Sequence, residues 1–177
     1  TEPSINLPHL CDRALVALVH AAIIGVDSQH QHLLLHERPS LSFGMLSLDV
    51  GAVTHNSDNL PGVPIKPLEE ALQFLSQQDP EDPQPFRVVG AGPAGIEVAL
   101  ALRRRWPRRA LNLQTRPDQL NAGTKSILRR AHIHCVTDAS AEATLLCTGS
   151  RAPFWLAESG FAVDHDGRVL TDAFLQL

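Results

Sequence analysis

The residues best suited to chemistry form a glycine-rich turn after a short apolar segment. In "FRVVGAGPAGIEVA" three glycines have the spacing G-x-G-x-x-G. In such a turn the first glycine allows a tight bend, the second lets a pyrophosphate approach the backbone, and the third lets the following helix pack against the strand. Amides at the start of that helix face the phosphates. The alternative is a purely structural glycine turn. The predicted dinucleotide site comprises Gly90, Ala91, Gly92, Pro93, Ala94 and Gly95.

The ribose contact of this site is less complete than its phosphate contact. A carboxylate that binds the ribose hydroxyls usually stands about 20 residues further on, at the end of the second strand. That position reads "LNLQTRPDQ", with Gln114, Thr115 and Arg116 and no carboxylate before Asp118. An arginine here can bind the 2′-phosphate of NADP, or can be a solvated charge at a strand end. We therefore expect NAD(P)H, with NAD and NADP both open.

The remaining candidate residues do not complete a second kind of site. The histidines of "HQHLLLH" have no carboxylate or cysteine at ligand spacing, so we expect no metal site. No G-x-S-x-G motif is present for a serine nucleophile. Cys11, Cys135 and Cys147 form no C-x-x-C pair. We expect buried thiols rather than a disulfide, zinc or dithiol redox site.

The glycine turn lies in a stretch whose apolar pattern alternates between strands and helices. We expect strands at 86–92, 110–116, 133–137 and 143–150, and helices at 95–106 and 124–131. This stretch opens as a β-α-β unit. A basic cluster at the end of its first helix is expected to be solvated, and it comprises Arg103, Arg104, Arg105, Arg108 and Arg109.

The segments on either side have a different organisation. A short helix at 7–14 precedes three expected strands, 15–27, 32–38 and 41–51, which form a β-meander. A helix begins after Pro67, and a linker rich in proline and acidic residues covers 79–85. The tail has an expected helix at 153–160 and a hairpin that turns at 165–167.

Composition and charge exclude several classes of protein. The chain has 177 residues, is 44% hydrophobic and carries a formal net charge of -4. This balance gives no general attraction for nucleic acid or anionic lipid. The longest apolar run, 14–26, is shorter than the roughly 18 residues that a membrane span requires. The first residues do not resemble a signal peptide, so we expect a cytoplasmic protein.

Three stretches together resemble one known family. They are "FRVVGAGPAGIEVALALRRRW", "LSLDVGAVTHNSDNLPGVPIKPLEEALQFL" and "CTGSRAPFWLAESGFAVDHDGRVLTDAFLQ", and they cover most of the chain. They are similar to the FAD-dependent pyridine nucleotide-disulfide oxidoreductases, above all to the type II NADH dehydrogenase-like branch. That branch includes the flavoprotein module fused to selenide, water dikinase.

The resemblance implies an α/β protein with a three-layer, Rossmann-like FAD/NAD(P)-binding fold and a β-meander. Residues 1–80 would belong to an incomplete FAD-binding domain, 84–151 to an inserted NAD(P)-binding domain, and 152–177 to the FAD-binding domain again. NAD(P)H, with NADH slightly favoured, would pass a hydride to FAD, and a quinone-like or other small-molecule acceptor would take the electrons. A homodimer or a fusion to a selenide, water dikinase domain would be possible.

The resemblance also implies roles for residues outside the glycine turn. Glu97 would lie near the junction of flavin and nicotinamide, as a catalytic residue. "LSLDVGA" and "LLCTGSR" would be the crossings between domains, where Gly51, Thr148 and Gly149 lie close to cofactor.

Two features depart from the family pattern. No glycine motif for FAD precedes residue 15, and no "GD" strand end follows the tail. The chain therefore resembles a partial copy of such an enzyme. The alternative function is a non-catalytic dinucleotide-binding or interaction domain that has lost the flavin site.

Overall fold

The computed structural model of the protein describes residues 5–56, 59–116, 118–138 and 143–177. The chain divides into two compact units. The first comprises Thr1–Asp49, Phe154–Asp164 and Val169–Leu177, and the second comprises Val50–Pro153 and His165–Arg168. Each unit is described by itself below.

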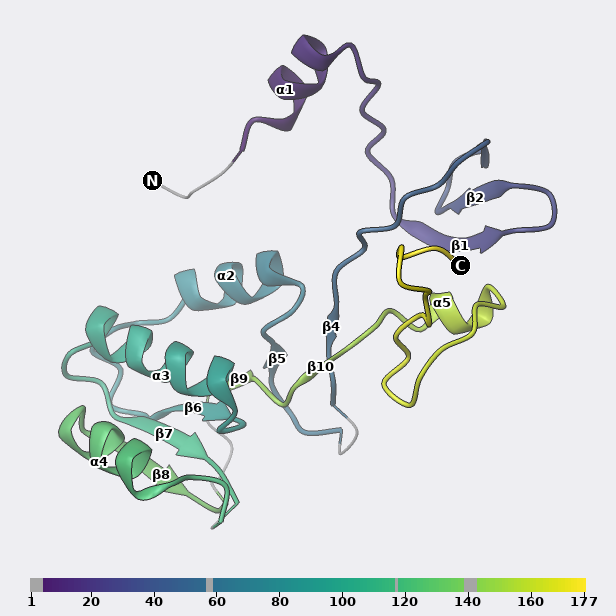
Figure 1. The fold of residues 1–177 in the computed structure, drawn as a ribbon. Coiled ribbons are helices and arrows are strands. Elements are labelled where there is room, and N and C mark those ends of the chain that lie inside the picture. The colour runs from purple at the N-terminus through teal and green to yellow at the C-terminus, as the bar shows by residue number, and fades with distance from the viewer. Residues whose placement is uncertain (1–4, 57–58, 117, 139–142) are drawn as a thin grey trace. The chain divides into compact units, whose positions relative to one another are not determined.

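The second unit is built on a parallel sheet (Figure 1). Its strands are β5 (Val63–Pro64), β6 (Phe86–Val89), β7 (Leu111–Gln114), β8 (Ile133–Val136) and β9 (Ala143–Leu146), in the order β5-β9-β6-β7-β8. All neighbouring strands run parallel. Its helices are α2 (Leu68–Ser76), α3 (Pro93–Arg105) and α4 (Ala122–Arg130). The expected α/β class and the β-α-β unit around the glycine turn are confirmed.

Local sequence explains where these helices begin. Pro93 occupies the first turn of α3, where its missing N–H costs no hydrogen bond. Asn121 caps α4, because its side-chain oxygen accepts a hydrogen bond of 2.8 Å from the amide of Thr124. The acidic residues Glu69 and Glu70 lie in the first turn of α2, where they suit the helix dipole.

The strand order reverses beside β6. From β6 the chain moves outward to β7 and then to β8, and it next returns to β9 on the other side of β6. Such a switch point leaves a crevice at the carboxyl ends of the two central strands, and ligands of open α/β sheets bind there. The fold therefore places the residues that follow β6 and β9 at the position of a binding site.

Two short strands pair with each other beside the carboxyl edge of this sheet. β4 (Val53–Thr54) and β10 (Ser150–Arg151) pair antiparallel, with Ser150 opposite Thr54 and Arg151 opposite Val53. The two similar sequence stretches expected to cross between domains lead into these strands. Gly51 has a φ of +68° and Gly149 a φ of +100°, so each stands where a side chain would strain the backbone.

An aromatic cluster lies in the core of the second unit. Phe86 of β6 lies between Phe74 of α2 and Trp106, which follows α3, with ring centroids 5.9 Å and 5.0 Å apart. Phe86 and Trp106 are both fully buried. Large buried rings of this kind dominate the hydrophobic stabilisation of a small domain.

Contrary to expectation, the basic cluster at the end of α3 is not solvated throughout. Arg109 is buried rather than solvated: its side chain is 0% exposed and lies over the rings of Phe86 and Trp106. It pairs with Asp82 at 3.0 Å and donates to the carbonyl of Asp79 at 2.9 Å. A helix-end pattern could not reveal this, because the partners lie 27 and 30 residues earlier.

Arg103 is engaged in a similar way. Its guanidinium donates to the carbonyl groups of Trp106, Pro107 and Arg109 in the loop after α3. The buried Arg109 therefore holds the acidic linker against the core, and the half-buried Arg103 holds the loop after α3. Arg104, Arg105 and Arg108 are exposed, as expected.

The first unit contains a three-stranded antiparallel meander, as expected. Its strands are β1 (Ile23–Asp27), β2 (His32–Leu35) and β3 (Leu41–Ser42), and its helices are α1 (Leu7–Ala14) and α5 (Trp155–Glu158). Residues 15–22 were expected to extend the first strand, and 43–51 the third, but neither segment is a strand. Leu15 has a left-handed φ of +55° and is 94% exposed. Apolar sequence alone does not form a strand without a partner to pair with.

The tail returns to this meander. α5 contacts β1, and the amide of Val26 donates to Ser159 Oγ at 2.9 Å. Gly160, with a φ of +84°, ends the helix as expected. Val163 and Val169 form an antiparallel bridge around the predicted turn. Among the described residues, no helix has the length and apolar character that a membrane span requires.

Candidate functional site

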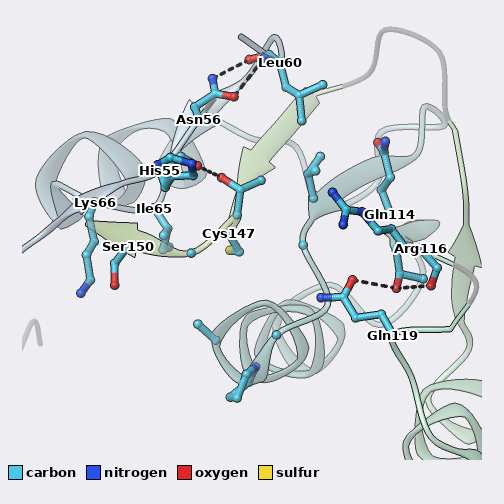
Figure 2. Close-up of a pocket in the computed structure, with 18 of the residues that line it drawn as sticks. His55, Asn56, Leu60, Ile65, Lys66, Gln114, Arg116, Gln119, Cys147 and Ser150 are labelled. Carbon is cyan, nitrogen blue, oxygen red and sulfur yellow. Dashed lines mark hydrogen bonds between the residues drawn. The ribbon is translucent and has the colours of Figure 1, made fainter. Parts of the chain in front are cut away.

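A pocket of about 720 Å³ opens at the carboxyl edge of the parallel sheet (Figure 2). It is lined by the ends of β6, β7 and β9, with Val89, Gln114 and Cys147, and by the start of α3. The pocket therefore lies at the switch point of the strand order, where the fold predicts a ligand.

Two glycines of the turn hold α3 against the sheet. A Cβ atom at Gly90, whose φ is +105°, would lie 2.3 Å from the carbonyl oxygen of Cys147. A Cβ atom at Gly95 would lie 1.8 Å from the carbonyl oxygen of Gly90. Neither position has room for a side chain, since such atoms need about 3.0 Å or more. The first and third glycines thus have the structural roles that the motif predicts.

Gly92 has a different environment. It caps α3 with an extended backbone, φ -70° and ψ 175°, which any residue can adopt. A Cβ atom there would meet nothing within 4 Å, and Gly92 lines the pocket. The absence of a side chain is therefore not required by the fold. It keeps open the space directly before the helix.

The start of α3 can bind an anion in that space. No side chain caps this helix within the described chain, and Pro93 has no N–H. The amides of Ala94 and Gly95 lie in the first turn, before the first helical hydrogen bond, from Ile96 to Gly92 at 3.1 Å. Free amides and the helix dipole at this end are suited to phosphate.

The opposite wall is formed beside the paired strands β4 and β10, by His55, which follows β4, and by Ser150 of β10 (Figure 2). The amide of His55 donates to the carbonyl of Gly149 at 3.0 Å, and Thr148 Oγ1 donates to the carbonyl of His55. The backbone of His55 is therefore fixed from both sides while the residue lines the pocket. Ser150 and Lys66 line the same wall.

The end of β7 closes the other side of the pocket, with Gln114, Thr115, Arg116 and Gln119. Thr115 Oγ1 lies 3.0 Å from the carbonyl oxygen of Arg116 and 3.3 Å from Gln119 Oε1, and these two acceptors share its single proton. These polar side chains stand where an acidic residue would bind a ribose in the usual motif.

The pocket is positive although the chain as a whole is negative. Among its lining residues that the structure describes, Lys66 and Arg116 are cationic and none is aspartate or glutamate. Burial raises the pKa of the Cys147 thiol to about 11, so this group adds no negative charge at neutral pH. An anionic ligand suits this lining.

The structure brings most of the predicted cofactor-binding residues together. Those that line the pocket are Gly90, Gly92, Pro93, Ala94, Thr115, Arg116, Thr148 and Gly149. Ala91 and Gly95 are buried behind them. Gly51 does not line the pocket, and Glu97 is exposed on α3, also outside the lining.

Sequence reasoning missed several residues of the lining. They are His55 and Asn56, which follow β4, Lys66, which follows β5, Gln119 in the loop after β7, and Ser150 of β10. The pairing of β5 with β9 joins residues more than 80 positions apart, at Val63 and Leu145. No local spacing signals such a contact. The only indication in the sequence was that two stretches resemble the segments that cross between domains in the known family.

Comparisons with known proteins identify the fold. No family model matches the chain, and no curated protein matches it. Solved structures do. A FAD-dependent pyridine nucleotide-disulphide oxidoreductase from Desulfovibrio vulgaris is similar with a TM-score of 0.66 and 19% identity, over 91% of this chain and 51% of that one. A ferredoxin reductase from Rhodopseudomonas palustris gives 0.69 and 17%, over 88% and 47%.

A third solved structure carries a nucleotide. The water-forming NADH oxidase from Lactobacillus brevis, bound to NADH, is similar with a TM-score of 0.66 and 18% identity, over 86% of this chain and 42% of that one. This chain thus spans about half the length of these structures. It has the Rossmann-like fold of FAD- and NAD(P)-binding oxidoreductases, as the sequence predicted.

Proposed function

We propose that the second unit binds NAD(P)H, and that the chain belongs to a flavin-dependent oxidoreductase in which NAD(P)H gives a hydride to FAD. The observation that carries the proposal is the contrast among the three glycines. Gly90 and Gly95 are required by packing, whereas Gly92 leaves open a space before uncapped helix amides, inside the pocket at the switch point. A structural turn has no need of that space, and a pyrophosphate does.

The chain's own residues would divide the binding of the dinucleotide. The amides of Ala94 and Gly95 would hold the pyrophosphate, and the side chains at the end of β7 would meet the adenosine ribose. The wall that contains His55, Thr148 and Gly149 would position the nicotinamide half. The nicotinamide supplies the hydride chemistry, and the protein supplies its position and surroundings.

The FAD part of the proposal is supported by the comparisons of fold rather than by a site in the described residues. The solved structures with this fold include proteins named as FAD-dependent or as NADH oxidase, and this chain spans about half of their length. The catalytic role of Glu97 and the proximity of Gly51 to cofactor depend on how FAD would be placed. The division into 1–80, 84–151 and 152–177 stays a prediction, and residues 50–80 pack in the same unit as 84–151.

Finer assignments also stay predictions. They are the NADH dehydrogenase-like branch, a quinone-like acceptor, a cytoplasmic location, a homodimer and a fusion to a selenide, water dikinase domain. One solved neighbour is a putidaredoxin reductase in a covalent complex with putidaredoxin, so a protein acceptor is a second class to assay.

Two measurements on the purified chain separate the enzyme from the non-catalytic alternative. Fluorescence titration with NADH and NADPH tests the dinucleotide site, and we expect saturable binding of at least one. Dye reduction by the bound dinucleotide with added FAD tests the chemistry. Binding without flavin retention or turnover would favour the non-catalytic domain, and binding of neither dinucleotide would refute the proposed function.

A further inference from the structure

We propose that this pocket selects a dinucleotide that carries an extra phosphate on its adenosine ribose, as NADPH does. The inference rests on the proposed dinucleotide function and concerns the end of β7. It reverses the slight preference for NADH that the family resemblance implied. Its basis is that the side chains at this position offer hydrogen-bond donors and no carboxylate.

The first observation is the orientation of Gln114. Arg87, a buried residue of β6, donates from Nη1 to Gln114 Oε1 at 3.3 Å and from Nε to Thr144 Oγ1 at 3.0 Å. A guanidinium has only donors, so this contact requires the oxygen end of the amide to face Arg87. The NH₂ end of Gln114 is then the group left to contact a ligand. Arg87 thus acts as a positioning residue for the pocket.

The second observation concerns Gln119. Its Oε1 atom lies 3.3 Å from Thr115 Oγ1, and its NH₂ group is the end of the amide turned away from that hydroxyl. Figure 2 shows Gln114, Arg116 and Gln119 gathered on one side of the pocket. Together with the guanidinium of Arg116, this side presents two amide donors and one cation.

The third observation is that the described lining of the pocket contains no negatively charged hydrogen-bond acceptor. No aspartate or glutamate occurs among the described residues that line the pocket. In an NAD site a carboxylate accepts the hydrogen bonds of the ribose hydroxyls. A phosphate is an acceptor only and carries about two negative charges, so it matches a set of donors next to an arginine. Lys66 lies on the opposite wall with His55 and does not belong to this set (Figure 2).

The test measures dissociation constants of NADPH and NADH for the full chain and for two arginine variants. We expect the wild-type chain to bind NADPH at least tenfold more tightly than NADH. Arg116→Ala is expected to weaken NADPH binding about tenfold and to leave NADH binding within twofold. Arg108→Ala is the matched control, because it removes the same charge from an arginine that is 83% exposed and outside the pocket.

A reciprocal variant supplies the missing acceptor. Gln114→Glu keeps an oxygen for Arg87 and replaces the NH₂ group by a second oxygen, so the ratio of NADPH to NADH affinity is expected to fall at least tenfold. Competition by adenosine 2′,5′-bisphosphate but not by 5′-AMP would place the effect at the extra phosphate. Equal affinity for NADH and NADPH, with no effect of Arg116→Ala, would overturn the inference and leave the proposed function intact. Binding of neither would refute both.

Discussion

Substitution of two motif glycines, Gly92 and Gly95, by alanine tests the glycine turn most sharply, because the structure gives each a different role. At Gly92 the new methyl group meets nothing within 4 Å, and the backbone conformation is ordinary. Gly92→Ala is therefore expected to change the free energy of unfolding by no more than about 0.5 kcal/mol. The same methyl group projects into space that the pyrophosphate requires, so dinucleotide affinity is expected to fall about tenfold or more, or about 1.4 kcal/mol.

Gly95→Ala is expected to have the opposite profile. Its Cβ atom would lie 1.8 Å from the Gly90 carbonyl oxygen, so α3 must move about 1 Å away from the sheet. Overpacking of this kind costs about 3 kcal/mol, and the better helix propensity of alanine returns about 1 kcal/mol. The net loss of about 2 kcal/mol corresponds to a fall in Tm of roughly 4–8 °C.

The assay for this set combines thermal unfolding with titration of NADPH. Gly44→Ala is the matched control, because a Cβ atom there also meets nothing within 4 Å and the residue lies outside the pocket. It should change neither stability nor affinity. The reasoning is refuted if Gly92→Ala binds NADPH as the wild-type chain does, or if Gly95→Ala unfolds at the wild-type temperature.

Two further predictions concern stability. Arg109→Ala should lower the free energy of unfolding by about 3 kcal/mol in denaturant titration, because it leaves Asp82 and a linker carbonyl without their buried partner. Arg109→Lys should restore little of this loss, since an ammonium lacks the planar fork, and full restoration would contradict the account. The buried Cys147 thiol, with its pKa raised from 9.0 to about 11, should make the free energy of unfolding fall as the pH rises from 9 to 11, because only the unfolded thiol then ionises. Between pH 9 and pH 11 the fall attributable to this thiol is about 2 kcal/mol, and Cys147→Ala should remove it; an identical pH profile for the variant would count against the burial argument.

The sequence predicts local features of this protein well. The glycine spacing, the strand before it and the helix after it are governed by residues close together in the chain, and the structure confirms them. Helix α1 and the helix after Pro67 were also found, because proline and apolar spacing signal them locally. The predicted cofactor-binding residues of the turn follow from the same pattern.

Features that depend on distant contacts were missed or misjudged. Arg109 lies in a run of arginines that suits a solvated helix end, and only tertiary packing supplies its partner Asp82. His55 and Lys66 enter the pocket lining because β4 and β5 pair with strands near residue 150. Residues 15–22 are apolar enough for a strand, but no described strand pairs with them. The spacing of apolar residues predicts a strand but does not identify a pairing partner that lies far away in the sequence.

The central claim, that a dinucleotide lies over the start of α3, is tested most directly by ¹⁵N–¹H spectra of the labelled chain during titration with NADPH. The account predicts that the amide signals of Gly92, Ala94 and Gly95 shift in a saturable way, whereas those of Gly44 and Gly123, outside the pocket, do not. Saturable shifts confined to other residues, or no shifts at millimolar NADPH and NADH, would contradict it.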